Sequence, residues 1–250
     1  MKHAERVMGT VVSFDVRGGT PDALADACAV LQSADAVFST WQPDSPMSRL
    51  RRGELLVGDA PREVIDVLGL CAEAKRVTGG WFDPWRMPGG VDPTGLVKGW
   101  AAQRAADALR EAGAEAAMVN AAGDIVTFGE PVPARPWQVG IRDPRAPDLI
   151  AWVVSSRDGA VATSAAYERG DHVLDPHTGA PARAALSATV TGPDLALADA
   201  LATGLFAAGA AALELIDALP GYSGLVVEPG GEARVGDGFP LLTAAGSSSA

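Results

Sequence analysis

The sequence has few of the residues that mark disulfide-rich, zinc-finger or nucleic-acid-binding proteins. Its 250 residues include two cysteines, Cys28 and Cys71, whose separation fits neither a disulfide framework nor a zinc-finger spacing. We therefore expect both to be buried, reduced thiols. No run of lysines and arginines occurs and the formal net charge is −11, so neither a nucleic acid nor an anionic membrane is an expected partner. An anionic ligand would need a local cation, either a side chain or a metal.

Long hydrophobic runs are also missing. The first residues, MKHAERVMGT, lack the apolar run of about 7–15 residues that a signal peptide requires. No window reaches the roughly 20 uncharged apolar residues of a membrane span. The sequence as it stands therefore predicts a cytoplasmic protein with no membrane span. Its composition, with 48% hydrophobic and 20% charged residues, is typical of a globular protein. We expect one domain over residues 1–243 and a flexible tail over 244–250.

Helical patterns are concentrated in the first half of the chain and strand patterns in the second. This order predicts an α+β fold rather than a regular βαβ alternation. A β-branched stretch at 7–16 predicts a strand, and residues 81–95 are too rich in proline and glycine for regular structure. Apolar spacing predicts helices at 21–39, 62–77, 97–112 and 191–206. Further strands are expected at 116–121, 137–143, 150–156, 159–164, 171–175, 185–192, 222–228 and 233–236.

The segment TGPDLALADALATGLF, residues 191–206, predicts a helix that is apolar on nearly every side and therefore buried. It nevertheless carries Asp199 in its middle, and Thr203, four residues later, shares the same face. Two such oxygens could contribute to a Mg²⁺ or Ca²⁺ site, because hard cations prefer oxygen ligands. The residues alone equally allow a structural role. In that case Thr203 bonds to a carbonyl one turn earlier, and Asp199 pairs with an arginine or caps another helix.

The segment VDPTGLVKGWA, residues 91–101, predicts a turn that leads into a helix. Backbone amides at a helix start, together with Lys98, suit a phosphate or another anion. Gly95 would let the main chain approach a ligand closely, and its carbonyl could complete a cation site. An ordinary loop-to-helix junction with an exposed lysine is the alternative.

Two other features are candidates for a ligand site. His172, one of three histidines, precedes a DPHTG turn and could be a general base or a structural histidine. Aromatic residues gather near loops, where they could stack on a planar ring or pack in the core. They are Trp41, Trp81, Phe82 and Trp85.

Taken in order, the motifs of this chain resemble those of the FAD:protein FMN transferases, the ApbE family. The motifs are VMGT, FSTWQPDSPMSRL, GGWFDPW, VDPTGLVKGWA, VNAAGD, WQVGIRDP, VATSAAYER, HVLDPHTG and ADALATG, from residue 7 to about 209. The resemblance implies a T-fold-like α+β architecture, FAD as substrate and Mg²⁺ as cofactor. It also implies transfer of FMN to a Ser or Thr hydroxyl of an acceptor flavoprotein, with release of AMP. Some relatives instead hydrolyse FAD to FMN and AMP, and a non-catalytic FAD-binding or storage protein is a further alternative.

The resemblance also implies roles for single residues. Asp199, Thr203 and the Gly95 carbonyl would bind Mg²⁺, which would offset the buried carboxylate, and His172 would be the base for the acceptor hydroxyl. The residues implied to contact FAD are Met8, Trp41, Trp81, Phe82, Asp83, Asp92, Lys98 and Leu174. The chain departs from the family pattern at Ala122 and Ala165, where glycine is expected, and at Ala202, where some relatives carry a second acid.

Overall fold

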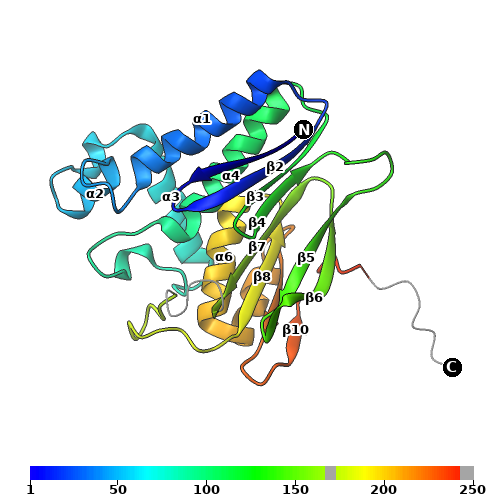
Figure 1. Cartoon of the computed structure of the whole chain (residues 1–250). Helices are drawn as coiled ribbons and strands as arrows, with labels where there is room; N and C mark the ends of the chain where they lie inside the picture. The colour runs from blue at the N-terminus through cyan, green and yellow to red at the C-terminus, as the bar shows by residue number, and fades with distance from the viewer. Residues whose placement is uncertain (167–172, 243–250) are drawn as a thin grey trace.

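The computed structural model describes residues 1–166 and 173–242, and within them eight strands form one antiparallel sheet (Figure 1). The strand order is β1-β2-β3-β4-β7-β8-β9-β10. The strands are β1 Lys2–Val7, β2 Thr10–Arg17, β3 Ala116–Ala121, β4 Asp124–Phe128, β7 Gly159–Ala165, β8 Ser187–Gly192, β9 Ser223–Val227 and β10 Ala233–Val235. Together with the helices, this sheet gives the α+β class that the sequence predicts.

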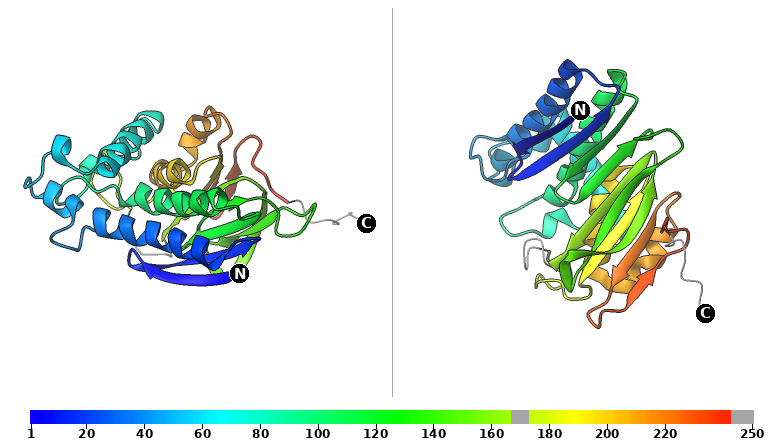
Figure 2. Two further views of the ribbon diagram at one scale, coloured as in Figure 1. Left: turned by 90° about the horizontal axis from the view of Figure 1, so that it is seen from above. Right: turned by 45° about the vertical axis from the view of Figure 1, so that its right-hand side comes forward.

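Three helices lie side by side across one face of the sheet, and a fourth packs beyond them (Figure 2). The three are α1 (Pro21–Phe38), α4 (Thr94–Glu111) and α6 (Leu195–Ala208), and the fourth is α3 (Arg62–Val77). Shorter helical segments are α2 (Pro46–Arg51), α7 (Leu213–Asp217) and the 3₁₀ turns η1 (Val57–Asp59), η2 (Pro84–Arg86) and η3 (Gly209–Ala212). The predicted helices at 21–39 and 62–77 agree with the structure, and α4 begins three residues earlier than predicted.

Helix α6 lies in the middle of the core, against β7, β8 and α4. Its first turn is capped by the Asp194 carboxylate, which accepts a hydrogen bond from the Leu197 N–H at 2.9 Å. The continuous stretch Leu195–Asp217 has the length and hydropathy of a membrane span, but 72% of its apolar window is buried inside the fold. Burial on all sides is a sufficient reason for its apolar composition.

A hairpin covers part of the opposite face of the sheet (Figure 1). Its strands, β5 (Trp137–Asp143) and β6 (Ala146–Ser156), come between β4 and β7 in the chain, although β4 and β7 are neighbours in the sheet. Val139 and Val154 of the hairpin pack on Ile125, Val161 and Leu225 of the sheet, forming a second, smaller core. The helices and the hairpin therefore cover opposite faces of one sheet.

Two strand predictions need correction. The strand predicted across 7–16 is confirmed from Thr10 onward as β2, but its start is wrong. The chain turns at Met8 and Gly9, which have φ of +52° and +68°, and so forms the β1–β2 hairpin. The sequence pattern does not predict β4, whose five residues are all buried and so show no alternation. In the predicted strand 171–175, residues 171 and 172 lie outside the described residues, and Leu174 forms an isolated bridge with Pro181.

Candidate functional site

Two of the three predicted metal ligands meet where the start of α4 approaches α6. A Cβ built on Gly95 would lie 3.5 Å from Thr203 Oγ1 and 3.2 Å from the Phe82 ring. Thr203 Oγ1 also lies 3.3 Å from the hydroxyl of Ser164 on β7. Glycine at 95 therefore leaves its backbone open to this space, and two hydroxyl groups face it from α6 and β7.

Asp199, one turn before Thr203 on α6, is buried and contacts the backbone of α4. Its Oδ2 accepts a hydrogen bond from the Gly99 N–H at 3.1 Å. In a regular α-helix that N–H points toward the carbonyl of Gly95, so the Asp199 carboxylate lies on the same side of α4 as that carbonyl. All three predicted ligands thus border one region between α4 and α6.

The close crossing of α4 and α6 depends on glycine at position 99. A Cβ at Gly99 would lie 2.5 Å from the Leu195 carbonyl oxygen and 2.9 Å from Asp199 Cβ. Such contacts are too short for any side chain, so a larger residue would push the helices apart. The small residue therefore sets the distance at which Asp199 meets α4.

Lys98 forms a buried ion pair with Asp124, an acid that the sequence pattern does not single out. Its Nζ contacts Oδ2 of Asp124, whose side chain is 1% exposed, and the other carboxylate oxygen accepts from the Thr163 N–H at 3.0 Å. The sequence feature that could have indicated this ion pair is Asp124, the last residue of VNAAGD, because a carboxylate that becomes buried requires a partner. The pair fixes Lys98 at the junction of α4, β4 and β7.

A cavity of about 880 Å³ lies beside this ion pair, on the sheet face that also carries the β5–β6 hairpin. It is lined by Lys98 and by polar residues that include Ser13, Asn120, Gln138 and Arg142. Its volume is within the roughly 300–1,000 Å³ of small-molecule sites. Lys98 and Arg142 are the local cations that an anionic ligand would need on this acidic chain.

Two predicted FAD-binding acids shape the loop between α3 and α4. Asp83 forms an ion pair with Lys75 at 2.7 Å and accepts from the Trp85 N–H at 3.1 Å. Asp92 forms an ion pair with Arg51 of α2 at 2.8 Å and accepts from the Thr94 N–H at 3.1 Å. Because both carboxylates are already engaged, their observed contribution is to fix the loop that carries Trp81 and Phe82.

The remaining predicted residues are distributed over several loops. Phe82 is buried, whereas Trp41 is 93% exposed. Of the two roles expected for these aromatic residues, packing in the core therefore applies to Phe82 and not to Trp41. Trp81 packs edge-on against the ring of His177, with centroids 4.5 Å apart. Leu174 directly precedes the DPHTG loop, residues 175–179, which contains His177. His172 lies outside the described residues.

The DPHTG loop that contains His177 is organised by Asp175. Its carboxylate accepts from the His177 N–H at 2.8 Å and from the Thr178 hydroxyl at 3.0 Å. These bonds, the amide bond first, lower the pKa of Asp175, so the carboxylate is ionised at neutral pH. The loop therefore presents His177 to Trp81 in a fixed orientation.

One departure from the family pattern lies in the turn next to the cavity. Asn120 accepts from the Gly123 N–H at 2.8 Å, and the two loop residues Ala122 and Gly123 have φ of +53° and +102°. A residue other than glycine in this region is strained, by about 1–2 kcal/mol. The methyl group of Ala122 therefore adds strain to a turn that borders the cavity.

Replacing Ala122 with glycine is expected to raise the free energy of unfolding by up to about 1 kcal/mol, because relief of strain exceeds the entropy that glycine gains in the unfolded chain. Urea unfolding would measure it. Gly123→Ala is the matched control and should destabilise the protein, because φ near +102° is unfavourable for any side chain. A lower midpoint for Ala122→Gly would contradict the strain argument.

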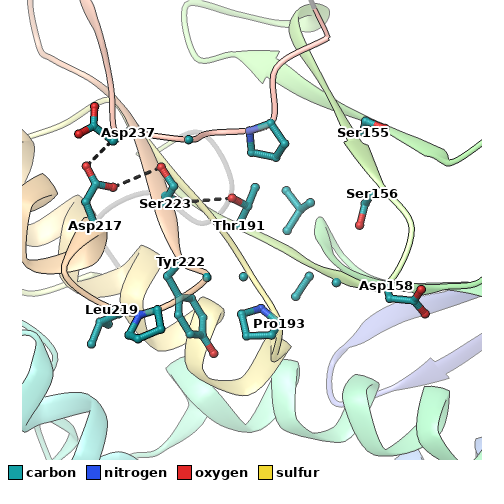
Figure 3. Close-up of a pocket in the computed structure, with 18 of the residues that line it drawn as sticks. Ser155, Ser156, Asp158, Thr191, Pro193, Asp217, Leu219, Tyr222, Ser223 and Asp237 are labelled. Atoms are coloured by element: carbon teal, nitrogen blue, oxygen red, sulfur yellow. Dashed lines mark hydrogen bonds between the residues drawn. The ribbon is translucent and has the colours of Figure 1, made fainter.

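A second cavity, of about 590 Å³, lies around the loop that leads into β9 (Figure 3). Asp217 is one of the acids that line it, and it accepts from the Ser223 hydroxyl at 3.2 Å and from the Asp237 N–H at 3.0 Å. Within the described residues, none of those predicted to contact FAD or Mg²⁺ lines this cavity. Asp217 is therefore a structural acid that joins two loops.

Comparisons with known proteins identify the same family as the sequence motifs do. The ApbE family model matches residues 8–90 and 85–226. A FAD:protein FMN transferase of Rhodobacter capsulatus is 38% identical over 128 residues, 48% of this chain and 24% of that protein. One of Treponema pallidum is 32% identical over 168 residues, 60% of this chain and 46% of that protein. The matches thus span between a quarter and a half of these relatives' length.

Solved structures show the same fold. The flavin transferase ApbE from Vibrio cholerae superposes with a TM-score of 0.83 at 21% identity, and the match covers 95% of this chain and 97% of that chain. An ApbE protein from Thermotoga maritima gives 0.83 at 24% identity, with the same coverage. These likenesses confirm the ApbE-like α+β fold predicted from the sequence.

Proposed function

Because the chain belongs to the ApbE family, we propose that it transfers the FMN moiety of FAD to a Ser or Thr hydroxyl of an acceptor flavoprotein, with release of AMP and in dependence on Mg²⁺. The observation that supports this proposal most directly is the approach of Gly95, Asp199 and Thr203 in one region between α4 and α6. These residues come from segments about 100 positions apart in the chain. Their convergence supports the magnesium site that the resemblance implies.

The residues present fit a magnesium ion. A carboxylate, a hydroxyl and a backbone carbonyl are all oxygen donors, the class that Mg²⁺ prefers. A side chain at position 95 would occupy the space that Thr203 faces, so glycine there keeps the backbone accessible. We assign Asp199, Thr203 and the Gly95 carbonyl as the magnesium ligands, and Mg²⁺ bound there would neutralise charge on the diphosphate of FAD.

The proposed reaction forms one bond and breaks one. The acceptor oxygen attacks the phosphorus on the FMN side, a phosphoester forms, the pyrophosphate bond breaks, and AMP leaves with the electron pair of that bond. The acceptor hydroxyl must also lose its proton, and we assign this step to His172 on the strength of the resemblance. Lys98, fixed by Asp124 at the cavity, supplies a positive charge for the phosphates.

The proposed FAD contacts beyond Lys98 follow from the resemblance alone. Met8, Trp41, Trp81, Phe82, Asp83, Asp92 and Leu174 are the residues assigned. A crystal structure with FAD would test them individually. The exposed ring of Trp41 is free to stack on a planar group, whereas buried Phe82 would contribute through the loop that it anchors.

Incubation with FAD, Mg²⁺ and a flavoprotein acceptor is expected to yield AMP and an acceptor whose mass has increased by one FMN. Chromatography would measure AMP, and mass spectrometry would locate the added mass on a Ser or Thr residue. Equal AMP release without the acceptor would favour FAD hydrolysis instead. FAD that stays intact with both Mg²⁺ and the acceptor would favour a binding or storage protein.

A further inference from the structure

A second group of potential metal ligands lies far from the proposed magnesium residues in the sequence, where β1 meets α1. His3 and Glu5 are two residues apart on a strand and therefore project to the same side. Their register partners, Phe14 and Val12, are buried core residues, so that side faces the helices. Cys28 of α1 completes the group. A histidine nitrogen, a carboxylate oxygen and the Cys28 sulfur all lie within 4.8 Å of one another.

The spacing of the first two ligand atoms matches a tetrahedral metal site. Zinc bonds to nitrogen and oxygen are about 2.0–2.1 Å long, so neighbouring ligands at tetrahedral angles lie about 3.3–3.4 Å apart. His3 Nε2 and Glu5 Oε2 are separated by 3.3 Å. The Cys28 sulfur lies within 4.8 Å of both atoms and must come closer to them for all three to bind one ion.

A neighbouring amide orients one of the three ligands. Glu5 Oε1 accepts a hydrogen bond from the Gln32 amide at 2.8 Å, one turn along α1 from Cys28. The other carboxylate oxygen, Oε2, is left to face His3. The His3 ring lies near the Phe14 ring, with centroids 6.1 Å apart. A hydrogen bond such as that from Gln32 to Glu5 is typical of the groups that orient metal ligands in proteins.

We propose that His3, Glu5 and Cys28 bind a zinc-class divalent transition metal, with water as the fourth ligand. Imidazole and thiolate favour such metals, whereas the oxygen donors at Asp199 favour magnesium, so the two sites select different ions. The metal would join the edge strand β1 to α1. The sequence did not reveal this site, because its ligands come from a strand and a helix that only the fold brings together.

The state of the thiol distinguishes the metal-bound form from the metal-free form. Cys28 is a free cysteine and is buried beside Glu5, surroundings that favour the neutral thiol. A bound metal displaces that proton, because the ligand is the thiolate. Metal uptake should therefore release a proton from the protein, which a weakly buffered titration can detect.

The test is a Co²⁺ titration of the full chain after treatment with a chelator. A thiolate-to-cobalt absorption band is expected in the near ultraviolet, together with the strong visible bands of tetrahedral Co²⁺, and Zn²⁺ should displace both. Cys28→Ser should abolish the near-ultraviolet band. His3→Ala alters an exposed residue and should weaken binding by more than the roughly 10–100-fold that loss of a supporting contact costs.

Three matched variants test whether the cobalt–thiolate band arises from Cys28 and its neighbours. Cys71→Ser removes the other buried thiol, His177→Ala removes another described histidine, and Asp199→Ala removes the proposed magnesium ligand. All three should keep the cobalt–thiolate band. The proposal is overturned if wild-type protein gives no such band, or if Cys71→Ser loses it as completely as Cys28→Ser. Because the readout needs neither FAD nor an acceptor, it is independent of the proposed transfer activity.

Discussion

Replacing Asp199 with alanine is expected to reduce Mg²⁺-dependent AMP release from FAD by a factor on the order of 10³, because a catalytic metal supplies several kcal/mol of charge stabilisation. The residual rate should no longer respond to added Mg²⁺. Asp199 is buried and accepts a hydrogen bond from Gly99, so its removal also leaves that amide without this acceptor. AMP formation measured across a range of Mg²⁺ concentrations would reveal both effects.

Two further variants distinguish the loss of a metal ligand from a loss of stability. Asp199→Asn retains an oxygen that can accept from the Gly99 N–H but removes the charge. It should therefore be as inactive as Asp199→Ala but have a higher free energy of unfolding than that variant. Asp217→Asn is the matched control, since that acid also accepts from a backbone N–H but lies at the other cavity. It should keep its response to Mg²⁺. Full Mg²⁺-dependent activity in Asp199→Ala would remove this residue from the proposed metal site.

Much of the fold could be predicted because its helices have strong local patterns. The boundaries of α3 coincide with the predicted 62–77, and the uniformly apolar α6 is buried as its composition indicates. The early turn was missed because Met8, a residue that rarely adopts positive φ, shares it with Gly9. The hairpin β5–β6 could be recognised as two strands, but the sequence gives no sign that it leaves the sheet between β4 and β7.

The candidate site was predicted less completely, because its contacts join distant parts of the chain. The i, i+4 spacing of Asp199 and Thr203 places them on one face from local geometry alone. No local rule indicates that Ser164 approaches Thr203, or that Asp199 accepts a hydrogen bond from the Gly99 N–H. The partner of Lys98 likewise depends on sheet topology, since Asp124 becomes its neighbour only after β4 has paired with β7.

Replacing Lys98 with alanine is expected to lower the free energy of unfolding by about 3 kcal/mol, the lower end of the range for removing one partner of a buried ion pair. The lower end applies because the Lys98 side chain is 22% exposed, whereas that of Asp124 is 1% exposed. The carboxylate would keep the Thr163 N–H as a hydrogen-bond donor but lose its cation. Urea denaturation would measure the change.

A double variant tests whether the loss of stability comes from the Asp124 carboxylate left without its cation. In the Lys98→Met, Asp124→Asn double variant, the asparagine oxygen can still accept from the Thr163 N–H and no buried charge remains, so most of the stability should return. Arg62→Ala is the matched control, because its ion pair with Asp66, at 2.8 Å, is largely exposed. That change should cost only about 0.3–0.5 kcal/mol. If the double variant is no more stable than Lys98→Ala, the loss reflects packing of the lysine stem instead.

Whatever its stability, the double variant should bind FAD more weakly, since it lacks the positive charge that Lys98 presents to the cavity.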